Sequence, residues 1–314
     1  AVCFAIIGAG MGVLHYYLGD IVRTDVDESK LSANESEDGI INLAFFGIDS
    51  ESTQGRSDAI LVVSVDVKDA TVKMVSIARD TYVTIPDYGN TKINHAYAYG
   101  GPELAIRTLN ENFHLDITDY VAVNFDQLAD VIDAFGGIDL EITEAERVQI
   151  NAYLLSGEPL RTSGYVHLNG PQAVSYARIR KIDNDNGRTE RQRKVLTCLF
   201  EKITQISPTQ YPSYVKQFAP LVETSLGNDE ILAIGAIGLK SNIRLEQGAF
   251  PNEYIAYQGG SFYGAWYYMY DIEQAADMLH QFIYEDIPFS EYGKEPETAE
   301  GQTEEDTQTA SNNH

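Results

Sequence analysis

Basic residues gather in one short stretch of a chain that is otherwise strongly acidic. The 314 residues carry 22 Lys and Arg against 47 Asp and Glu, a formal net charge of −25, yet Arg178, Arg180, Arg188 and Arg191 fall close together. Arg188 and Arg191 are three residues apart and therefore share one face of a predicted helix. Four converging guanidinium groups repel one another, and a pyrophosphate has the charge and acceptor oxygens to offset this. The pattern predicts an anion site; a solvated basic helix face is the alternative.

Two carboxylates stand at the ends of neighbouring predicted strands. Asp49 comes just after the apolar run 41–48, and Asp58 comes just before the run 59–65. Carboxylates at adjacent strand ends can share one divalent cation, and hard oxygen ligands with phosphate nearby favour Mg²⁺. The alternative is turn and cap chemistry, because Asp is common in turns.

Further polar residues follow the next predicted strand, 71–77. Arg79 and Asp80 lie where an open sheet places its ligands, and a guanidinium there can grip a phosphate with two hydrogen bonds. The alternative is that this pair only organises a loop. Lys92 offers a point charge, and Asn94 offers both a donor and an acceptor. His95 is either a base or a structural residue.

The elements that must position these residues alternate between strands and helices. Strands are expected at 41–48, 59–65, 71–77, 120–125, 138–142 and 253–257, and helices at 102–112, 126–135, 170–180, 188–206, 230–237 and 271–283. The short segment 67–70 predicts a hairpin between the second and third strands. Alternating strands and helices indicate a layered α/β domain, which we expect to span 40–290.

The segments outside that domain differ in composition. Residues 1–18 are almost entirely apolar and long enough for a transmembrane anchor, which we favour over a cleaved signal peptide. Because the segment starts without Met or a cytoplasmic flank, we expect the anchor to be truncated. Residues 19–39 are polar and are interpreted as a linker, and the acidic tail 291–314 is expected to be disordered.

Composition and motifs exclude several classes of function. The net charge argues against nucleic-acid binding, which needs a basic face. The chain has no P-loop, GxGxxG, HExxH or GxSxG motif. Its two Cys, Cys3 and Cys198, have neither disulfide nor metal-site spacing. The aromatic run 262–268 is expected in core or rim packing, with sugar stacking as the alternative.

Several short motifs follow one another in a fixed order over about residues 41–206. They are Gly47-x-Asp49, Arg56-Ser57-Asp58, Ser76-Ile77-Ala78-Arg79-Asp80, Lys92-Ile93-Asn94-x-Ala96-Tyr97, Gly100-Gly101, Asn124-Phe125, Gly136-Gly137-Ile138-Asp139, Leu168-Asn169-Gly170 with Gln172-Ala173, and Tyr176-Ala177-Arg178-x-Arg180 running to Arg191-Gln192. This ordered set resembles the LytR-CpsA-Psr family of cell-wall ligases. Two positions depart from the family pattern: Ala78, where Pro is usual, and Asn186-Gly187, where an aromatic residue is common.

The resemblance implies a fold and a set of site residues. The fold would be three-layer α/β/α around a central mixed sheet, with an apolar tunnel for a polyprenyl chain. Mg²⁺ would be held between the donor's phosphates and Asp49 and Asp58. Arg79 would be catalytic, and either Asp80 or Asp58 would take the hydroxyl proton, with Asp58 less free for this if it binds the metal. The implied pyrophosphate-binding residues are Arg56, Arg79, Lys92, Asn94, Arg178, Arg180, Arg188, Arg191 and Gln192.

The resemblance also implies an activity. The chain would be a single-pass membrane protein whose extracellular domain transfers a teichoic acid-like or capsular glycopolymer from polyprenyl pyrophosphate to peptidoglycan. No nucleic acid would be a partner. Two alternatives use the same residues: a phosphohydrolase that only cleaves the lipid pyrophosphate, and a non-catalytic receptor for polyprenyl lipid or wall polymer.

Overall fold

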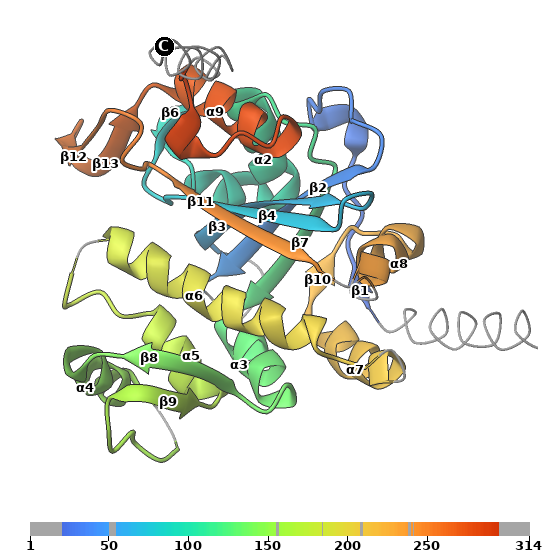
Figure 1. The fold of residues 1–314 in the computed structure, drawn as a ribbon. Coiled ribbons are helices and arrows are strands. Elements are labelled where there is room, and N and C mark those ends of the chain that lie inside the picture. The colour runs from blue at the N-terminus through green and yellow to red at the C-terminus, as the bar shows by residue number, and fades with distance from the viewer. Residues whose placement is uncertain are drawn as a thin grey trace, which may run out of the picture.

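A seven-stranded mixed sheet forms the centre of the molecule in the computed structural model (Figure 1). The structure describes residues 21–49, 55–154, 157–183, 185–207, 210–237, 240 and 242–294. The strand order is β1 (Val22–Arg23), β10 (Glu223–Thr224), β7 (Asp119–Asn124), β2 (Ile40–Ile48), β3 (Ser57–Asp66), β4 (Thr71–Ile77), β11 (Arg244–Phe250). Parallel pairs are β1–β10, β7–β2 and β4–β11, and the others are antiparallel. The expected mixed sheet and the β3–β4 hairpin are confirmed.

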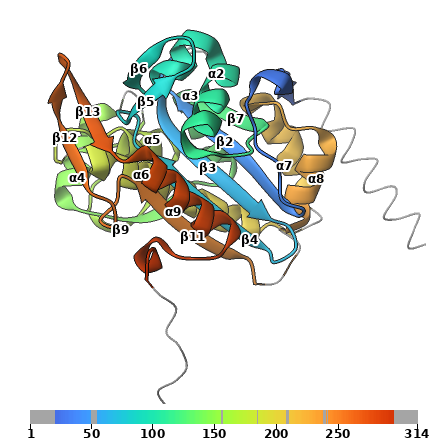
Figure 2. The same cartoon turned by 90° about the horizontal axis from the view of Figure 1, so that it is seen from above.

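Helices cover both faces of the sheet. On one side lie α2 (His95–Phe113) and α9 (Ile272–Tyr284), and on the other lie α3 (Phe125–Ala134) and α6 (Asp185–Thr204), as Figures 1 and 2 show. The backbone of α2 breaks at Gly100 and Gly101, where Gly101 has a φ of 64°, so the expected helix from 102 begins as its second part. The α/β expectation of helices flanking a mixed sheet is confirmed.

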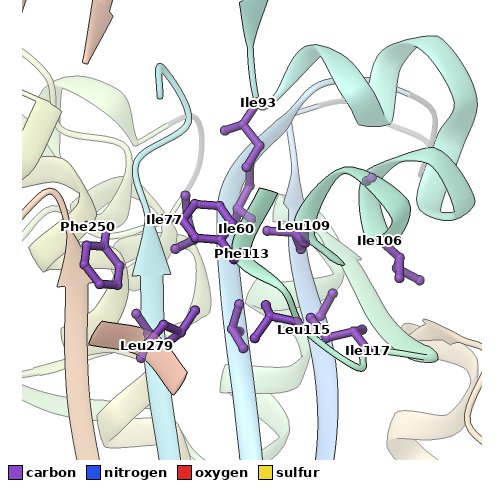
Figure 3. Close-up of a cluster of buried hydrophobic side chains, with 14 of the residues drawn as sticks. Ile60, Ile77, Ile93, Ile106, Leu109, Phe113, Leu115, Ile117, Phe250 and Leu279 are labelled. Atoms are coloured by element: carbon purple, nitrogen blue, oxygen red, sulfur yellow. The ribbon is translucent and has the colours of Figure 1, made fainter. Parts of the chain in front are cut away.

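The main core lies between the sheet and the α2–α9 layer (Figure 3). Ile60 and Ile77 point from the sheet toward Leu109 and Phe113 of α2, and Leu279 of α9 closes the cluster. Each is almost fully buried. Burying one such side chain contributes about 1.5–3 kcal/mol, so this layer holds the strand ends in place.

A smaller unit beneath the sheet positions the basic segment. It contains β8 (Ile138–Ile142), β9 (Gly164–Leu168), α4 (Glu144–Tyr153) and α5 (Gly170–Ala177), with a buried cluster of its own. Asn169 caps α5 through a capping box with Gln172. A Cβ on Gly170 would lie 2.0 Å from the carbonyl oxygen of Ala129, so only glycine allows α5 to approach α3 this closely. Arg178 is the C-cap of α5, so the end of this helix determines where its side chain begins.

Two expected segments differ in the structure. Within the expected linker 19–39, Leu31 is fully buried in the core and β1 pairs with β10, so part of this segment packs onto the domain. The strand expected at 253–257 is absent there, and β12 (Tyr257–Phe262) instead pairs with β13 (Ala265–Tyr270). The reason is the tight turn at Tyr263 and Gly264: both have positive φ, which fixes the hairpin register beyond 257.

The remaining elements are short. They are β5 (Tyr82–Ile85), β6 (Gly89–Lys92), α7 (Tyr211–Phe218), α8 (Asn228–Ile237), and the 3₁₀ turns η1 (Glu28–Lys30), η3 (Ala219–Leu221) and η4 (Phe289–Glu291). The expected anchor 1–18 and most of the expected tail, from 295 onward, lie outside the described residues. Among the helices that are described, none is both long enough and apolar enough to cross a membrane.

Candidate active site

One edge of the sheet collects the polar residues that the motifs single out. Strands β2 and β4 both run toward this edge, and β3 runs away from it because it is antiparallel to both. Asp49 after β2, Asp58 at the start of β3 and Arg79 after β4 therefore lie at the same edge. Topology alone brings together side chains from three separate motifs.

The buried carboxylate of Asp58 is the centre of the site. Nη1 of Arg79 donates a hydrogen bond to its Oδ1 at 2.7 Å, and Nη2 of Arg180 donates to its Oδ2 at 2.5 Å. Nη1 of Arg188 lies 3.8 Å from the same Oδ2. The Arg188 side chain is only 1% exposed, so this charge has been moved out of water. Three arginines from a strand end, a loop and a helix converge on one carboxylate.

The arginines also determine the protonation state of Asp58. Burial by itself raises the pKa of this carboxyl, but the charges of Arg79 and Arg188, with the hydrogen bond from Arg79, outweigh burial and hold the pKa below its usual value. Asp58 is therefore ionised at neutral pH.

A second carboxylate lies beside the first. Asp80 is buried and accepts an ion pair from Nζ of Lys92 at 2.6 Å, while Nε of Arg79 lies 3.6 Å away. Asn94 is also buried, and its backbone N–H donates to the carbonyl of Arg79. The side-chain oxygen of Asn94 is buried without a hydrogen-bond partner among the described residues. A buried acceptor left unsatisfied costs free energy, so this oxygen marks a position for a ligand donor.

Asp49 and the remaining loop arginine form the outer part of the site. Arg178 and Arg180 place their Nη2 atoms 3.8 and 3.9 Å from the carboxylate of Asp49. The guanidinium of Arg178 also lies over the ring of Phe125, 4.7 Å from its centroid. Because these side chains are about half exposed, their ion pairs are weak and open to exchange with a ligand.

Other residues in the predicted site have contacts away from Asp58. Both Nη atoms of Arg191 hydrogen-bond the carboxylate of Asp183 at 2.7 Å, and Nη2 also donates to the carbonyl of Ile179. Gln192 is buried and lines an apolar cavity. Arg56 is exposed, and its charge acts on His95. The structure thus brings Arg79, Arg180 and Arg188 together and turns Arg191 toward a different carboxylate.

His95 lies at the margin of the site. Its Nδ1 is 3.0 Å from the hydroxyl of Thr91 and 3.4 Å from that of Tyr99. Burial lowers the pKa of His95, the charges of Arg56 and Lys92 lower it further, and Asp80 opposes them. The imidazole is therefore neutral at pH 7.

The donor set fits a magnesium ion only together with a ligand. Within the described residues, no group of three or more His, Cys, Asp or Glu side chains lies close enough to hold a metal. Asp49 and Asp58 nevertheless face the same Nη2 atom of Arg180. Mg²⁺ commonly takes one or two carboxylates and completes its shell with phosphate oxygens and water. The two carboxylates would suit that arrangement if a phosphate took their place as the partner of Arg180.

A small apolar cavity adjoins the site beneath the sheet. Its lining includes Phe45 and Gly47 of β2, Ala59 of β3, Leu128 of α3 and Leu196 of α6. Because its lining comes from the sheet and from α3 and α6, the cavity lies between the sheet and these helices. Figure 1 shows that α3 and α6 are on the sheet face opposite α2 and α9. An apolar group joined to a phosphate at Asp58 has a dry surface within reach.

Three partners of the site residues were not singled out from the sequence. Phe125 lies under Arg178, Asp183 pairs with Arg191, and the ring of Tyr267 lies 5.7 Å from Nζ of Lys92. The motif Asn124-Phe125 was the one available signal for Phe125. Nothing in the spacing of Asp183 or Tyr267 indicates their contacts, because these depend on how side chains pack in three dimensions.

The fold and the site together define an α/β protein in which three arginines converge on a buried carboxylate beside a small apolar cavity. The chain belongs to the LytR_cpsA_psr family, whose model matches residues 19–283.

Relatives with known names support the same grouping. The chain is 30% identical to the polyisoprenyl-teichoic acid–peptidoglycan teichoic acid transferase TagU of Oceanobacillus iheyensis, covering 87% of this chain and 88% of that one. It is 34% identical to TagU of Enterococcus faecalis over 68% of this chain and 70% of that one. A solved structure of TagT bound to LIIa-WTA is also similar, with a TM-score of 0.66 and 25% identity over 80% of this chain and 94% of that chain.

Proposed function

We propose that this protein transfers a phosphate-linked glycopolymer from a polyprenyl pyrophosphate carrier to peptidoglycan. The observation that carries the proposal is the convergence of Arg79, Arg180 and Arg188 on the buried carboxylate of Asp58. Five cationic side chains and three carboxylates share this edge, so the site has an excess of positive charge for a pyrophosphate. Relatives that are named teichoic acid transferases support the choice of donor and acceptor.

The reaction replaces the phosphoanhydride bond of the donor with a phosphodiester bond to the acceptor. A wall-sugar hydroxyl attacks the glycan-proximal phosphorus, a new P–O bond forms, and the bond to the bridging oxygen breaks. Polyprenyl phosphate leaves with the bond electrons, and a phosphodiester joins glycan to peptidoglycan. Such a transfer needs positioning and charge neutralisation more than covalent catalysis by the protein. Arg79, Arg180 and Arg188 supply both at the phosphates.

Asp80 is the better acceptor of the hydroxyl proton. Asp58 has its pKa held low by arginines and is therefore a weak base. Asp80 forms one short ion pair, with Lys92. Asn94 lies nearby, because its backbone N–H donates to the carbonyl of Arg79, the residue before Asp80. The unsatisfied amide oxygen of Asn94 would accept a hydrogen bond from a ligand hydroxyl. We therefore assign Asp80 as the general base and Asn94 as the residue that orients the attacking hydroxyl.

Magnesium and the lipid complete the proposal. Asp49 and Asp58 would hold Mg²⁺ with phosphate oxygens of the donor, and the ion would neutralise charge that develops on the leaving phosphate. The apolar cavity lined by Phe45, Ala59 and Leu196 would receive the first part of the prenyl chain. Because the cavity is small, α3 and α6 must separate from the sheet when the lipid enters. With this donor and this acceptor, the reaction would take place at the outer face of the cell membrane.

The test is a reconstituted transfer. The full chain is incubated with a polyprenyl-pyrophosphate glycan, peptidoglycan oligomers and Mg²⁺, and the covalent product is measured by mass spectrometry. We expect product with wild type and a loss of at least about 100-fold with Arg79→Ala or Asp58→Ala. Arg107→Ala is the matched control, because Arg107 pairs with Asp87 and Glu111 on the surface.

Each alternative function has its own outcome in this assay. Release of polyprenyl phosphate without an acceptor-linked product would identify a phosphohydrolase. Donor binding that survives Asp58→Ala, with no turnover by wild type, would identify a receptor. Full transfer by both Arg79→Ala and Asp58→Ala would disprove the assigned site.

A further inference from the structure

The β12–β13 hairpin is joined directly to the catalytic edge. The backbone N–H of Tyr268 donates to the carbonyl of Asp80 at 2.9 Å, and Thr81 forms a bridge with the same tyrosine. The hydroxyl of Thr81 lies 3.2 Å from that of Tyr270. Nζ of Lys92, which holds Asp80, lies 5.7 Å from the ring centroid of Tyr267. A molecule that reacts beside Asp80 therefore meets this hairpin as the adjoining surface.

The hairpin presents aromatic rings on both sides. On one face the register places Trp266 beside Tyr268 and Tyr257, with centroid distances to Tyr268 of 4.6 and 5.9 Å. At the turn, Tyr263 stacks on Tyr82 at 5.7 Å and 25°. While Tyr268 is buried, Tyr257, Trp266 and Tyr263 are 43%, 37% and 79% exposed. Rings held by their neighbours lose little freedom when a ligand stacks on them.

The absence of charged residues from the hairpin favours an uncharged ligand. Residues 254–270 include no charged side chain, and Glu253 and Asp271 flank them. An anionic membrane surface or a polyanionic glycopolymer requires basic residues, which this stretch lacks. An uncharged polymer with apolar sugar faces and hydroxyl edges suits amphipathic Tyr and Trp rings.

The position of the hairpin separates it from the lipid cavity. The hairpin lies on the side of the sheet that carries α9, while the cavity lies against α3 and α6 on the opposite face (Figure 1). Figure 2 shows the hairpin beside β5 and β6, the strands that lead to Lys92. The lipid of the donor and the partner on the hairpin therefore approach Asp80 from different sides.

We infer that the exposed rings of Tyr257, Tyr263 and Trp266 bind the uncharged glycan backbone of the acceptor strand and so deliver its hydroxyl to Asp80. This inference rests on the proposed function, because the acceptor is the substrate of that reaction. The hairpin would bind the acceptor, whereas the arginines around Asp58 would bind the pyrophosphate of the donor.

The experiment compares hairpin variants in two assays with the full chain. The first measures binding, without donor, of peptidoglycan glycan strands that have been freed of stem peptides and whose lactyl carboxyl groups have been converted to uncharged amides. The second measures KM for acceptor and for donor in the transfer reaction. Trp266→Ala and Tyr263→Ala should each weaken strand binding and raise the acceptor KM about tenfold, with kcat and donor KM near wild type. Tyr263→Phe keeps the ring and should behave as wild type.

Tyr165→Ala is the matched control. Tyr165 lies on β9 of the two-stranded β8–β9 sheet and is 78% exposed, nearly the same as Tyr263, but belongs to the unit beneath the central sheet. Trp266 packs over Gly259, so Trp266→Ala would remove a contact within the hairpin as well as a ligand-binding ring. Tyr263→Ala removes an exposed ring at the turn and therefore tests binding independently of that contact. Circular dichroism and thermal unfolding of each variant confirm the fold.

The outcomes separate the inference from the proposed function. If wild type transfers glycan and both alanine variants keep the acceptor KM, the inference is wrong while the function stands. A rise in donor KM alone would assign the hairpin to the donor glycan and overturn it. Binding of wild type to phosphatidylglycerol vesicles that Trp266→Ala abolishes, without binding to glycan strands, would make it a membrane contact. If wild type transfers nothing, the strand-binding assay still decides: no binding overturns the inference.

Discussion

Nη1 of Arg79 donates to Oδ1 of Asp58 at 2.7 Å, across two strand ends that are 21 residues apart in the chain. Asp58 thereby balances the arginines when no phosphate ligand is bound. Under the proposed function, a pyrophosphate would compete with this carboxylate for the same guanidinium groups, which would leave Asp58 available to hold a metal ion.

Replacing Asp58 by Asn should reduce stability in a pH-dependent way. Asn keeps the shape but removes the counter-charge of buried Arg188, which should cost about 2–3 kcal/mol of unfolding free energy at neutral pH. The folded pKa of Asp58 lies below the ordinary 3.8, so its stabilising contribution is complete above that pH and is lost as pH falls through the lower folded value.

Urea unfolding measured from about pH 7 downward tests this. The stability difference between wild type and Asp58→Asn should stay constant to about pH 4 and shrink only below it. The exposed Asp130 of α3 provides the control, since Asp130→Asn should change stability by less than ~0.5 kcal/mol. A difference that already disappears between about pH 7 and pH 5 would contradict the assigned protonation state.

Arg188 and Arg191 should differ although both are buried on one helix. Arg188 faces Asp58, so Arg188→Met should raise the donor KM about tenfold or more. Arg191 is bound to Asp183, so Arg191→Met should lower the unfolding free energy by about 3 kcal/mol and leave the donor KM within about threefold of wild type.

A double-mutant cycle with Asp183→Asn checks the structural role of Arg191. The two single changes should be strongly non-additive in stability, because each already breaks the same ion pair. If Arg191→Met instead raises the donor KM as much as Arg188→Met does, Arg191 binds the pyrophosphate as the family motif predicts, and its pairing with Asp183 belongs to the ligand-free state only.

Changing Asp49 to Asn should alter the metal requirement more than the fold. Asp49 is half exposed and only weakly paired, so stability should change by less than ~0.5 kcal/mol. If it helps to hold Mg²⁺, the Mg²⁺ concentration for half-maximal transfer should rise about tenfold. Asp69→Asn, in the β3–β4 turn, should leave it unchanged. Undiminished transfer by wild type in excess chelator would refute the magnesium proposal.

Filling the apolar cavity should weaken binding of the lipid part of the donor without weakening binding of pyrophosphate. Ala59 lines the cavity next to Gly47, and Ala59→Leu adds bulk there. We expect the KM for a long-chain polyprenyl donor to rise about tenfold, while binding of inorganic pyrophosphate with Mg²⁺ stays near wild type. Thermal unfolding identifies any loss of fold from overpacking. Equal effects on both ligands would show that the cavity does not hold the lipid.

Local patterns were enough to predict most of the central strands and helices. The apolar runs 41–48, 59–65 and 71–77 became β2, β3 and β4 because a buried strand needs continuous apolar residues. Segments with weaker patterns were missed or misplaced, as with β11, whose sequence includes Arg244, Glu246 and Gln247. It joins the sheet through parallel pairing with β4, which is remote in the chain. Pairing of that kind depends on the assembled fold.

The sequence by itself determined which residues could bind an anion, because residue type and motif order name Asp58, Arg79 and the arginines from 178 to 191. Only the tertiary structure decided their partners. Arginine side chains are long and flexible, so neighbours in sequence can reach different carboxylates: Arg188 faces Asp58, and Arg191 turns to Asp183. The same holds for the aromatic run. Its composition was evident, but the hairpin register and its contact with Asp80 buried Tyr268 and left Tyr263 exposed.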